Sequence, residues 1–125
     1  MSKTAVTSPE LTPPVGPFSQ AIEVGGFIFF SGQVGQDPAT GKLVAGDVTA
    51  QVEQTLSNIE VALAAAGKTL ADVVRVGVFL ADMGDFAALN AVYARRFEAP
   101  YPARTTVQAA ALPLGARVEI EVVAA

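Results

Sequence analysis

One arginine in a strand-like segment is placed to recognise a ligand. Period-two alternation across residues 101–108 puts Arg104, Thr106 and Gln108 on one face of the expected strand. A guanidinium held on a rigid strand presents a planar set of donors that matches a carboxylate. The alternative is a surface arginine at a sheet edge. Further polar residues at otherwise apolar positions favour the ligand-binding interpretation.

Three of these polar positions could contribute to a site. Ser31 and Gly32 end an apolar strand-like segment, where a hydroxyl and a glycine let backbone approach a ligand; simple strand termination explains them equally well. Asn90 interrupts the apolar stripe of a helix, where a buried amide needs partners. It either contacts the ligand or ties down a neighbouring loop. Glu119 shares a strand face with Glu121, and for Glu121 plain solvent exposure is sufficient.

Missing residue types narrow the possible chemistry. The chain has no cysteine and no histidine, which excludes disulfides, zinc–thiolate sites and nucleophile–base pairs built on either residue. Acid–base chemistry then falls to carboxylates, tyrosine, lysine, backbone or water. The net charge of −4 argues against broad nucleic-acid binding. Without a secretory signal or an apolar run of about 18 residues, we expect a soluble cytoplasmic protein.

Hydrophobic periodicity predicts the elements that position these residues. Asp47 is expected to cap a helix that ends at Gly67, and Asp85 opens a second helix through Phe97. Gly25 and Gly26 predict a tight hairpin with a primed turn. Strands are expected near residues 5–7 and over 19–24, 27–31, 73–80, 101–108 and 117–123. The apolar segments 27–30 and 73–80 are expected to be buried on both faces.

This order of elements predicts one α+β domain over residues 1–125. A mixed β-sheet would carry two helices packed on one face, which leaves its other face free. Hydrophobic residues make up 51% of the chain and charged residues 16%, against about a quarter in average soluble domains. Some apolar surface is therefore expected to be buried against further copies in a homo-oligomer, with an alanine-rich monomer as the alternative.

The chain resembles the Rid family, whose members are also described as YjgF/RidA-type or L-PSP endoribonuclease-like proteins. The resemblance covers nearly the whole sequence and is specific because five short motifs occur in order. They are Gly16-Pro17-Phe18-Ser19-Gln20, Ser31-Gly32-Gln33, Asp85-Phe86 with Asn90 and Tyr93, Tyr101-Pro102-Ala103-Arg104-Thr105, and Glu119-Ile120-Glu121. The resemblance implies a chorismate-mutase-like fold, a homotrimer with sites between subunits, and imine or enamine deaminase activity without a metal or organic cofactor.

The resemblance also implies a role for each candidate residue. Arg104 would bind the substrate carboxylate, and Glu119 would position or activate the attacking water. The backbone carbonyl of Thr106 would accept a hydrogen bond from the substrate nitrogen.

Four further residues would shape the pocket. Ser31 and Asn90 would line and brace it, Gly32 next to Ser31 would also contact the substrate, and Phe18 would close the pocket from a neighbouring subunit. Archetypal members have tyrosine where this chain has Phe18, so a hydroxyl is missing, and they often have cysteine where it has Thr106.

These roles predict hydrolysis of 2-imino acids such as 2-iminopropanoate and 2-iminobutanoate to 2-keto acids and ammonia. The imine carbon is already electrophilic, so orientation, charge pairing and a placed water suffice. Two alternatives remain. The chain could form a non-catalytic trimer that binds a small carboxylate, or it could be an RNA-directed ribonuclease, which its acidic charge disfavours.

Overall fold

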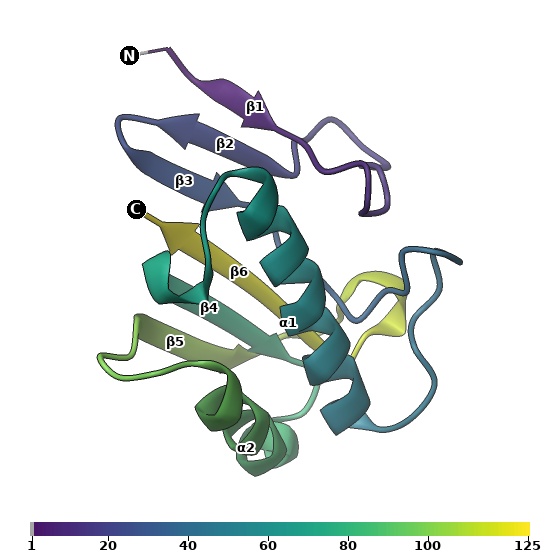
Figure 1. The fold of residues 1–125 in the computed structure, drawn as a ribbon. Helices are drawn as coiled ribbons and strands as arrows, with labels where there is room; N and C mark the ends of the chain where they lie inside the picture. The colour runs from purple at the N-terminus through teal and green to yellow at the C-terminus, as the bar shows by residue number, and fades with distance from the viewer. Residues whose placement is uncertain (1) are drawn as a thin grey trace.

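The structure, a computed structural model, describes residues 2–125 and shows one mixed sheet with two helices on one face (Figure 1). Within these residues the sheet has six strands in the order β1-β2-β3-β6-β4-β5. The strands are β1 (Thr4–Val6), β2 (Ala21–Val24), β3 (Phe27–Phe30), β4 (Val73–Leu80), β5 (Ala103–Gln108) and β6 (Val118–Ala124). The helices are α1 (Val48–Ala65) and α2 (Phe86–Arg96). The α+β prediction is confirmed. Nowhere in the described residues is a helix both long and apolar enough to span a bilayer.

Both helices lie in connections between strands that run in the same direction. Strands β3 and β4 each pair antiparallel with β6, which lies between them, so α1 connects two strands that run parallel. Helix α2 connects β4 to its direct parallel neighbour β5. The β2–β3 hairpin turns at Gly25 and Gly26, whose φ angles of 58° and 82° agree with the predicted primed turn.

Helix α1 begins and ends where its sequence predicts. The Asp47 side chain accepts a 3.1 Å hydrogen bond from the Ala50 N–H at the N-cap. Gly67 has a φ of 73°, and the N–H groups of Gly67 and Lys68 donate to carbonyls of the last helical turn. The predicted stripe packs on the sheet and is buried; it comprises Val48, Val52, Leu56, Ile59 and Leu63.

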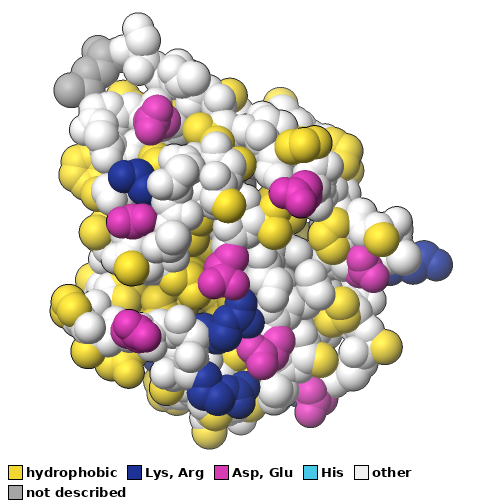
Figure 2. All heavy atoms as spheres, viewed as in Figure 1, with side chains coloured by type: hydrophobic (Ala, Val, Ile, Leu, Met, Phe, Trp, Pro, Cys, Tyr) yellow, Lys and Arg dark blue, Asp and Glu magenta, His cyan; other side chains and the backbone are white. Residues whose placement is uncertain are grey.

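Salt bridges fasten α2 to α1. Arg96 bonds the carboxylates of Glu53 at 2.9 Å and Glu60 at 2.8 Å, and Arg95 bonds Glu53 at 3.3 Å. Figure 2 shows basic and acidic side chains next to one another on this helical side of the molecule. Because Arg96 is half-buried and contacts two carboxylates, it holds α2 in place against α1.

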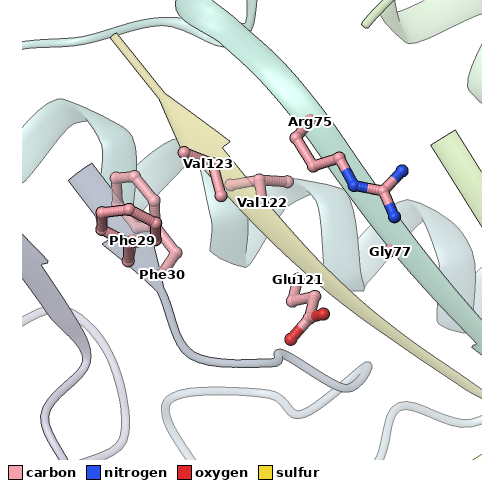
Figure 3. A pocket seen from close by; sticks show the side chains of 7 residues that line it. All are labelled: Phe29, Phe30, Arg75, Gly77, Glu121, Val122 and Val123. Carbon is pink, nitrogen blue, oxygen red and sulfur yellow. The ribbon is translucent and has the colours of Figure 1, made fainter. Parts of the chain in front are cut away.

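The second sheet face is open in the single chain, which corrects two predictions. Strand β3 was expected to be buried on both faces, but Phe27 is 49% and Phe29 48% exposed. Strand β4 was expected to be covered likewise, but Val74 is 46% exposed. Val74 lies at a register shift between β4 and β6. Both helices pack on the same side of the sheet, so Phe27 and Phe29 on its other side have no covering layer. Figure 3 shows this face around a shallow cavity of about 190 Å³, with Phe29, Arg75 and Glu121 among its lining residues.

Candidate functional site

The Arg104 side chain lies between edge strand β5 and helix α2. Its Nη2 donates a 2.7 Å hydrogen bond to Oδ1 of Asn90. Its Cζ lies 4.6 Å from the ring centroid of Tyr93 and 5.6 Å from that of Phe86. Tyr93 is itself held by stacking on Phe97, with 4.3 Å between centroids. The amide and the two rings fix the guanidinium in a half-buried position.

In the described part of the chain, no carboxylate forms a salt bridge with this guanidinium. Arg117 bonds both carboxylate oxygens of Asp85 at 2.9 Å, and Arg96 bonds Glu60 at 2.8 Å. In contrast, no Asp or Glu oxygen of residues 2–125 lies within 4.0 Å of the Arg104 nitrogens. A partly desolvated cation whose remaining donors are free is suited to an anionic ligand.

Thr106 lies next on the same face and offers a free backbone carbonyl. The Ala109 N–H donates to the Leu80 carbonyl at 2.8 Å. The odd-numbered residues of β5 therefore direct their backbone N–H and C=O groups toward β4. Thr106 has the opposite parity, and its carbonyl therefore points to the open edge of the sheet. Among the described residues, the Thr106 and Tyr93 hydroxyls are buried without a hydrogen-bond partner.

A second cluster lines an open cavity of about 250 Å³ elsewhere on the chain. Its polar wall contains Ser31, Gly32 and Glu119, and Phe18 lies on its rim. Ser31 Oγ donates to the Ser19 carbonyl at 2.6 Å, which fixes the hydroxyl. A Cβ at Gly32 would lie 2.7 Å from Oε2 of Glu119, so glycine is needed to leave this carboxylate in place. Residues 2–125 contain no group of three or more His, Cys, Asp or Glu side chains that could hold a metal ion.

The environment of Glu119 makes its carboxyl group more basic than usual. Burial raises the pKa of Glu119 above its ordinary value, and the neighbouring Glu121 carboxylate raises it further. A carboxylate with a raised pKa accepts a proton more readily at neutral pH. Glu119 is therefore suited to act as a general base toward a water molecule.

Within one chain the two clusters face away from each other. Arg104 is paired in register with Val76, which is buried under the helices, and Glu119 is paired with Phe79, which has the opposite parity. Arg104 and Glu119 thus lie on opposite faces of the sheet, and β4 lies between their strands, β5 and β6. The structure brings Arg104, Asn90 and Thr106 together in one cluster. It brings Phe18, Ser31, Gly32 and Glu119 together in the other.

Sequence reasoning missed two parts of these clusters. Tyr93 and Phe86 were named in a family motif without a role, as apolar residues of the helix stripe that Asn90 interrupts, but both rings contact the Arg104 guanidinium, and Phe86 is 38% exposed. The position of Asn90 in the same stripe was the available indication. The apolar part of the cavity, which includes Val15 and Leu114, gave no indication in the sequence.

The fold and the two clusters define a small α+β protein. Within its described residues, the half-buried Arg104 has no carboxylate partner, and Glu119 has a raised pKa. The family model described as endoribonuclease L-PSP matches residues 9–125. Protein DfrA of Myxococcus xanthus is 47% identical over 126 residues, which cover 99% of this chain and 96% of DfrA. A Capra hircus protein named 2-iminobutanoate/2-iminopropanoate deaminase is 50% identical over 110 residues, 88% of this chain and 80% of the relative.

Solved structures agree with these sequence relatives. The crystal structure of RidA from an Antarctic Psychrobacter species has a TM-score of 0.92 and 45% identity, covering 97% of this chain and 98% of RidA. The chain belongs to the Rid (YjgF/L-PSP) family.

Proposed function

We propose that this protein hydrolyses reactive 2-imino and enamine acids, such as 2-iminopropanoate and 2-iminobutanoate, to 2-keto acids and ammonia. The observation that carries the proposal is the Arg104 guanidinium, which is half-buried, held by Asn90 and two rings, and without a carboxylate partner. A 2-imino acid supplies the missing anion in its own carboxylate. The name of the Capra hircus relative supports the same reaction.

Each cluster would perform one part of the reaction. Arg104 binds the carboxylate with its free donors, and the Thr106 carbonyl accepts a hydrogen bond from the substrate nitrogen. Glu119 takes a proton from a water whose oxygen bonds to the imine carbon. The proton held by Glu119 passes to the imine nitrogen, which gives a carbinolamine. The hydroxyl proton then moves to the nitrogen as the C–N bond breaks, the nitrogen leaves as ammonia, and the carbon keeps the new oxygen as a ketone. The net change is addition of one water and loss of one ammonia.

Because the two clusters face away from each other in one chain, we propose that a complete site forms between two copies. Arg104, Asn90 and Thr106 would come from one copy, and Phe18, Ser31, Gly32 and Glu119 from its neighbour. The open sheet face, with Phe27 and Phe29 about half exposed, provides apolar surface for such an assembly.

A homotrimer is therefore expected in solution at micromolar concentration. Three copies related by a threefold axis give three equivalent contacts, each joining one Arg104 cluster to one Glu119 cavity. Sedimentation equilibrium or light scattering measures the mass. A stable monomer would leave the two clusters apart and contradict the shared site.

Replacing Gly32 with alanine is expected to lower kcat/KM by about a hundredfold with little change in the free energy of unfolding. The new Cβ would meet the Glu119 side chain, whose carboxylate Oε2 lies 2.7 Å away, and would displace it. A displacement of about 1 Å at a reacting group can cost about a hundredfold. The displaced atoms belong to a flexible side chain, so stability changes little. Kinetics and thermal melts check both parts; wild-type kinetics would show that the position of Glu119 is unimportant.

The function itself is tested by generating iminopropanoate in situ and detecting ammonia and 2-keto acid together. Catalysis is expected to release both in equal amounts, faster than spontaneous hydrolysis. A non-catalytic carboxylate-binding trimer would bind the 2-keto acid product but leave the rate of hydrolysis at its spontaneous value.

The ribonuclease activity in the family's description finds little support in the charges of this chain. The net charge is −4, and Arg95, Arg96 and Arg117 are engaged with carboxylates. Nucleic-acid binding depends on free cations that contact phosphates. No binding of single-stranded RNA is therefore expected at physiological salt.

A further inference from the structure

The cavity that holds Glu119 has apolar lining residues that the reaction itself does not require. They include Pro13, Pro14, Val15, Phe18, Pro113 and Leu114, which we call the apolar lining. From these residues we infer that the apolar lining binds the substrate's side chain and selects 2-imino acids with bulky aliphatic or aromatic side chains. The inference rests on the proposed function, since it places the imine carbon at Glu119.

A buried glutamine holds the segment that leads into Pro13 and Pro14 of the apolar lining. Gln20 is 5% exposed, and its Oε1 accepts a hydrogen bond from the Ser8 N–H at 2.6 Å. Its Nε2 donates to the carbonyls of Ser8 at 3.3 Å and Thr12 at 3.5 Å. Prolines at positions 13 and 14 stiffen the segment that follows. Val15, which is 94% exposed, directly follows this restricted segment.

Leu114 also lines the cavity, and its backbone conformation is strained. Its φ of 61° and ψ of 14° lie in the left-handed region, and among residues 2–125 it is the one non-glycine residue with a positive φ. Its side chain is 61% exposed. Strained residues of this kind concentrate at ligand sites. A glycine would relieve the strain. Within residues 2–125 the Leu114 side chain is left largely uncovered, whereas an apolar ligand group would cover it.

The size and charge of the cavity indicate which side chains fit. Its volume of about 250 Å³ exceeds the roughly 150 Å³ of an apolar cavity that binds benzene. A methyl side chain would leave most of it unfilled, whereas an isobutyl or benzyl group would contact the rim. Among the described residues lining it, none is Lys or Arg, and Glu119 is acidic. An acidic side chain would therefore be repelled and find no cation.

The test compares imines generated in situ from leucine, phenylalanine, alanine and glutamate by an amino-acid oxidase. Wild-type kcat/KM is expected to be about tenfold higher for the leucine- and phenylalanine-derived imines than for the alanine-derived one, and lowest for the glutamate-derived imine. Each fully buried methylene contributes about fourfold, so about tenfold corresponds to burial of between one and two of them in this open cavity.

Two variants probe Leu114 directly. Both Leu114→Gly and Leu114→Asn tolerate a positive φ, so they should fold, and each should lower the leucine-to-alanine ratio of kcat/KM by about fivefold. A structural role would instead change both substrates equally. The inference is overturned if wild type shows equal kcat/KM for all four imines. It is also overturned if the variants keep the wild-type leucine-to-alanine ratio. If they keep that ratio but dissociate the assembly, Leu114 packs against a second copy and not against the substrate.

These results distinguish a failure of the side-chain subsite from a failure of the proposed imine hydrolysis. Wild-type turnover of the alanine-derived imine without apolar selectivity would leave the proposed function intact and remove the subsite. No turnover of any imine above the spontaneous rate would remove both.

Discussion

Replacing Arg104 with alanine is expected to lower kcat/KM for iminopropanoate by at least about a hundredfold while the protein stays folded and trimeric. A charge-assisted hydrogen bond is worth about 1.5–3 kcal/mol, which corresponds to roughly ten- to a hundredfold, and a bidentate pair is worth more. Arg104→Lys should lose about tenfold, because an ammonium cannot rebuild the planar pair of bonds. Initial rates of keto acid release measure both losses.

Arg95→Ala is the matched control for this substitution. Arg95 is also an arginine, but it is exposed and bonds Glu53 at 3.3 Å on the surface of the helices. Exposed pairs of this kind contribute little to stability, so activity and assembly should be retained. Wild-type turnover by a trimeric Arg104→Ala protein would reduce Arg104 to a charge at the sheet edge.

Replacing Glu119 with glutamine is expected to lower kcat/KM by roughly a hundred- to ten-thousandfold, the range for loss of a general base. The free energy of unfolding at neutral pH should stay the same or rise. Burial raises the pKa of Glu119 in the folded protein, so its ionised form opposes folding above that pKa, and glutamine removes this penalty. Chemical denaturation at neutral pH checks the stability. Marked destabilisation would mean that Glu119 is structural.

Glu121→Gln serves as the control and tests the pH dependence. The proposed mechanism uses ionised Glu119, so wild-type kcat/KM should fall as pH falls through the raised pKa of that group. Glu121 raises the pKa of Glu119, and removing its charge should move the acid limb of the profile to lower pH. The same substrate is used for both proteins, so its own titration cancels. An unmoved limb would mean that another group limits the rate.

The sequence was sufficient for the elements whose ends and faces are set locally. Asp47 and Gly67 bound α1 because capping depends on neighbouring backbone groups, and the buried stripe between them follows the helical period. It was insufficient for burial that depends on partners. The aromatic segment Phe27–Phe30 predicted two covered faces, although the predicted layout with both helices on one face left the other face free, and in the single chain Phe27 and Phe29 are about half exposed.

The sequence singled out the candidate residues one by one, and the resemblance implied sites between subunits, but neither predicted which candidates lie together within one chain. Arg104 and Asn90 were singled out separately, and the structure joins them with a 2.7 Å hydrogen bond. Alternation placed Arg104 on one face of β5 and Glu119 on one face of β6. Only the strand order and register reveal that these faces are opposite, because both depend on contacts between distant segments.

Mixing the two inactive variants tests the central claim, that Arg104 of one copy and Glu119 of another act on the same substrate. Arg104→Ala and Glu119→Gln proteins are dissociated, combined in equal amounts and reassociated, and mixed trimers are verified by native mass spectrometry. Random mixing gives about a quarter of the sites an intact Arg104 and an intact Glu119 from neighbouring copies. Imine hydrolysis should return to about a quarter of the wild-type rate. Mixed trimers as inactive as either variant alone would contradict a site shared between copies.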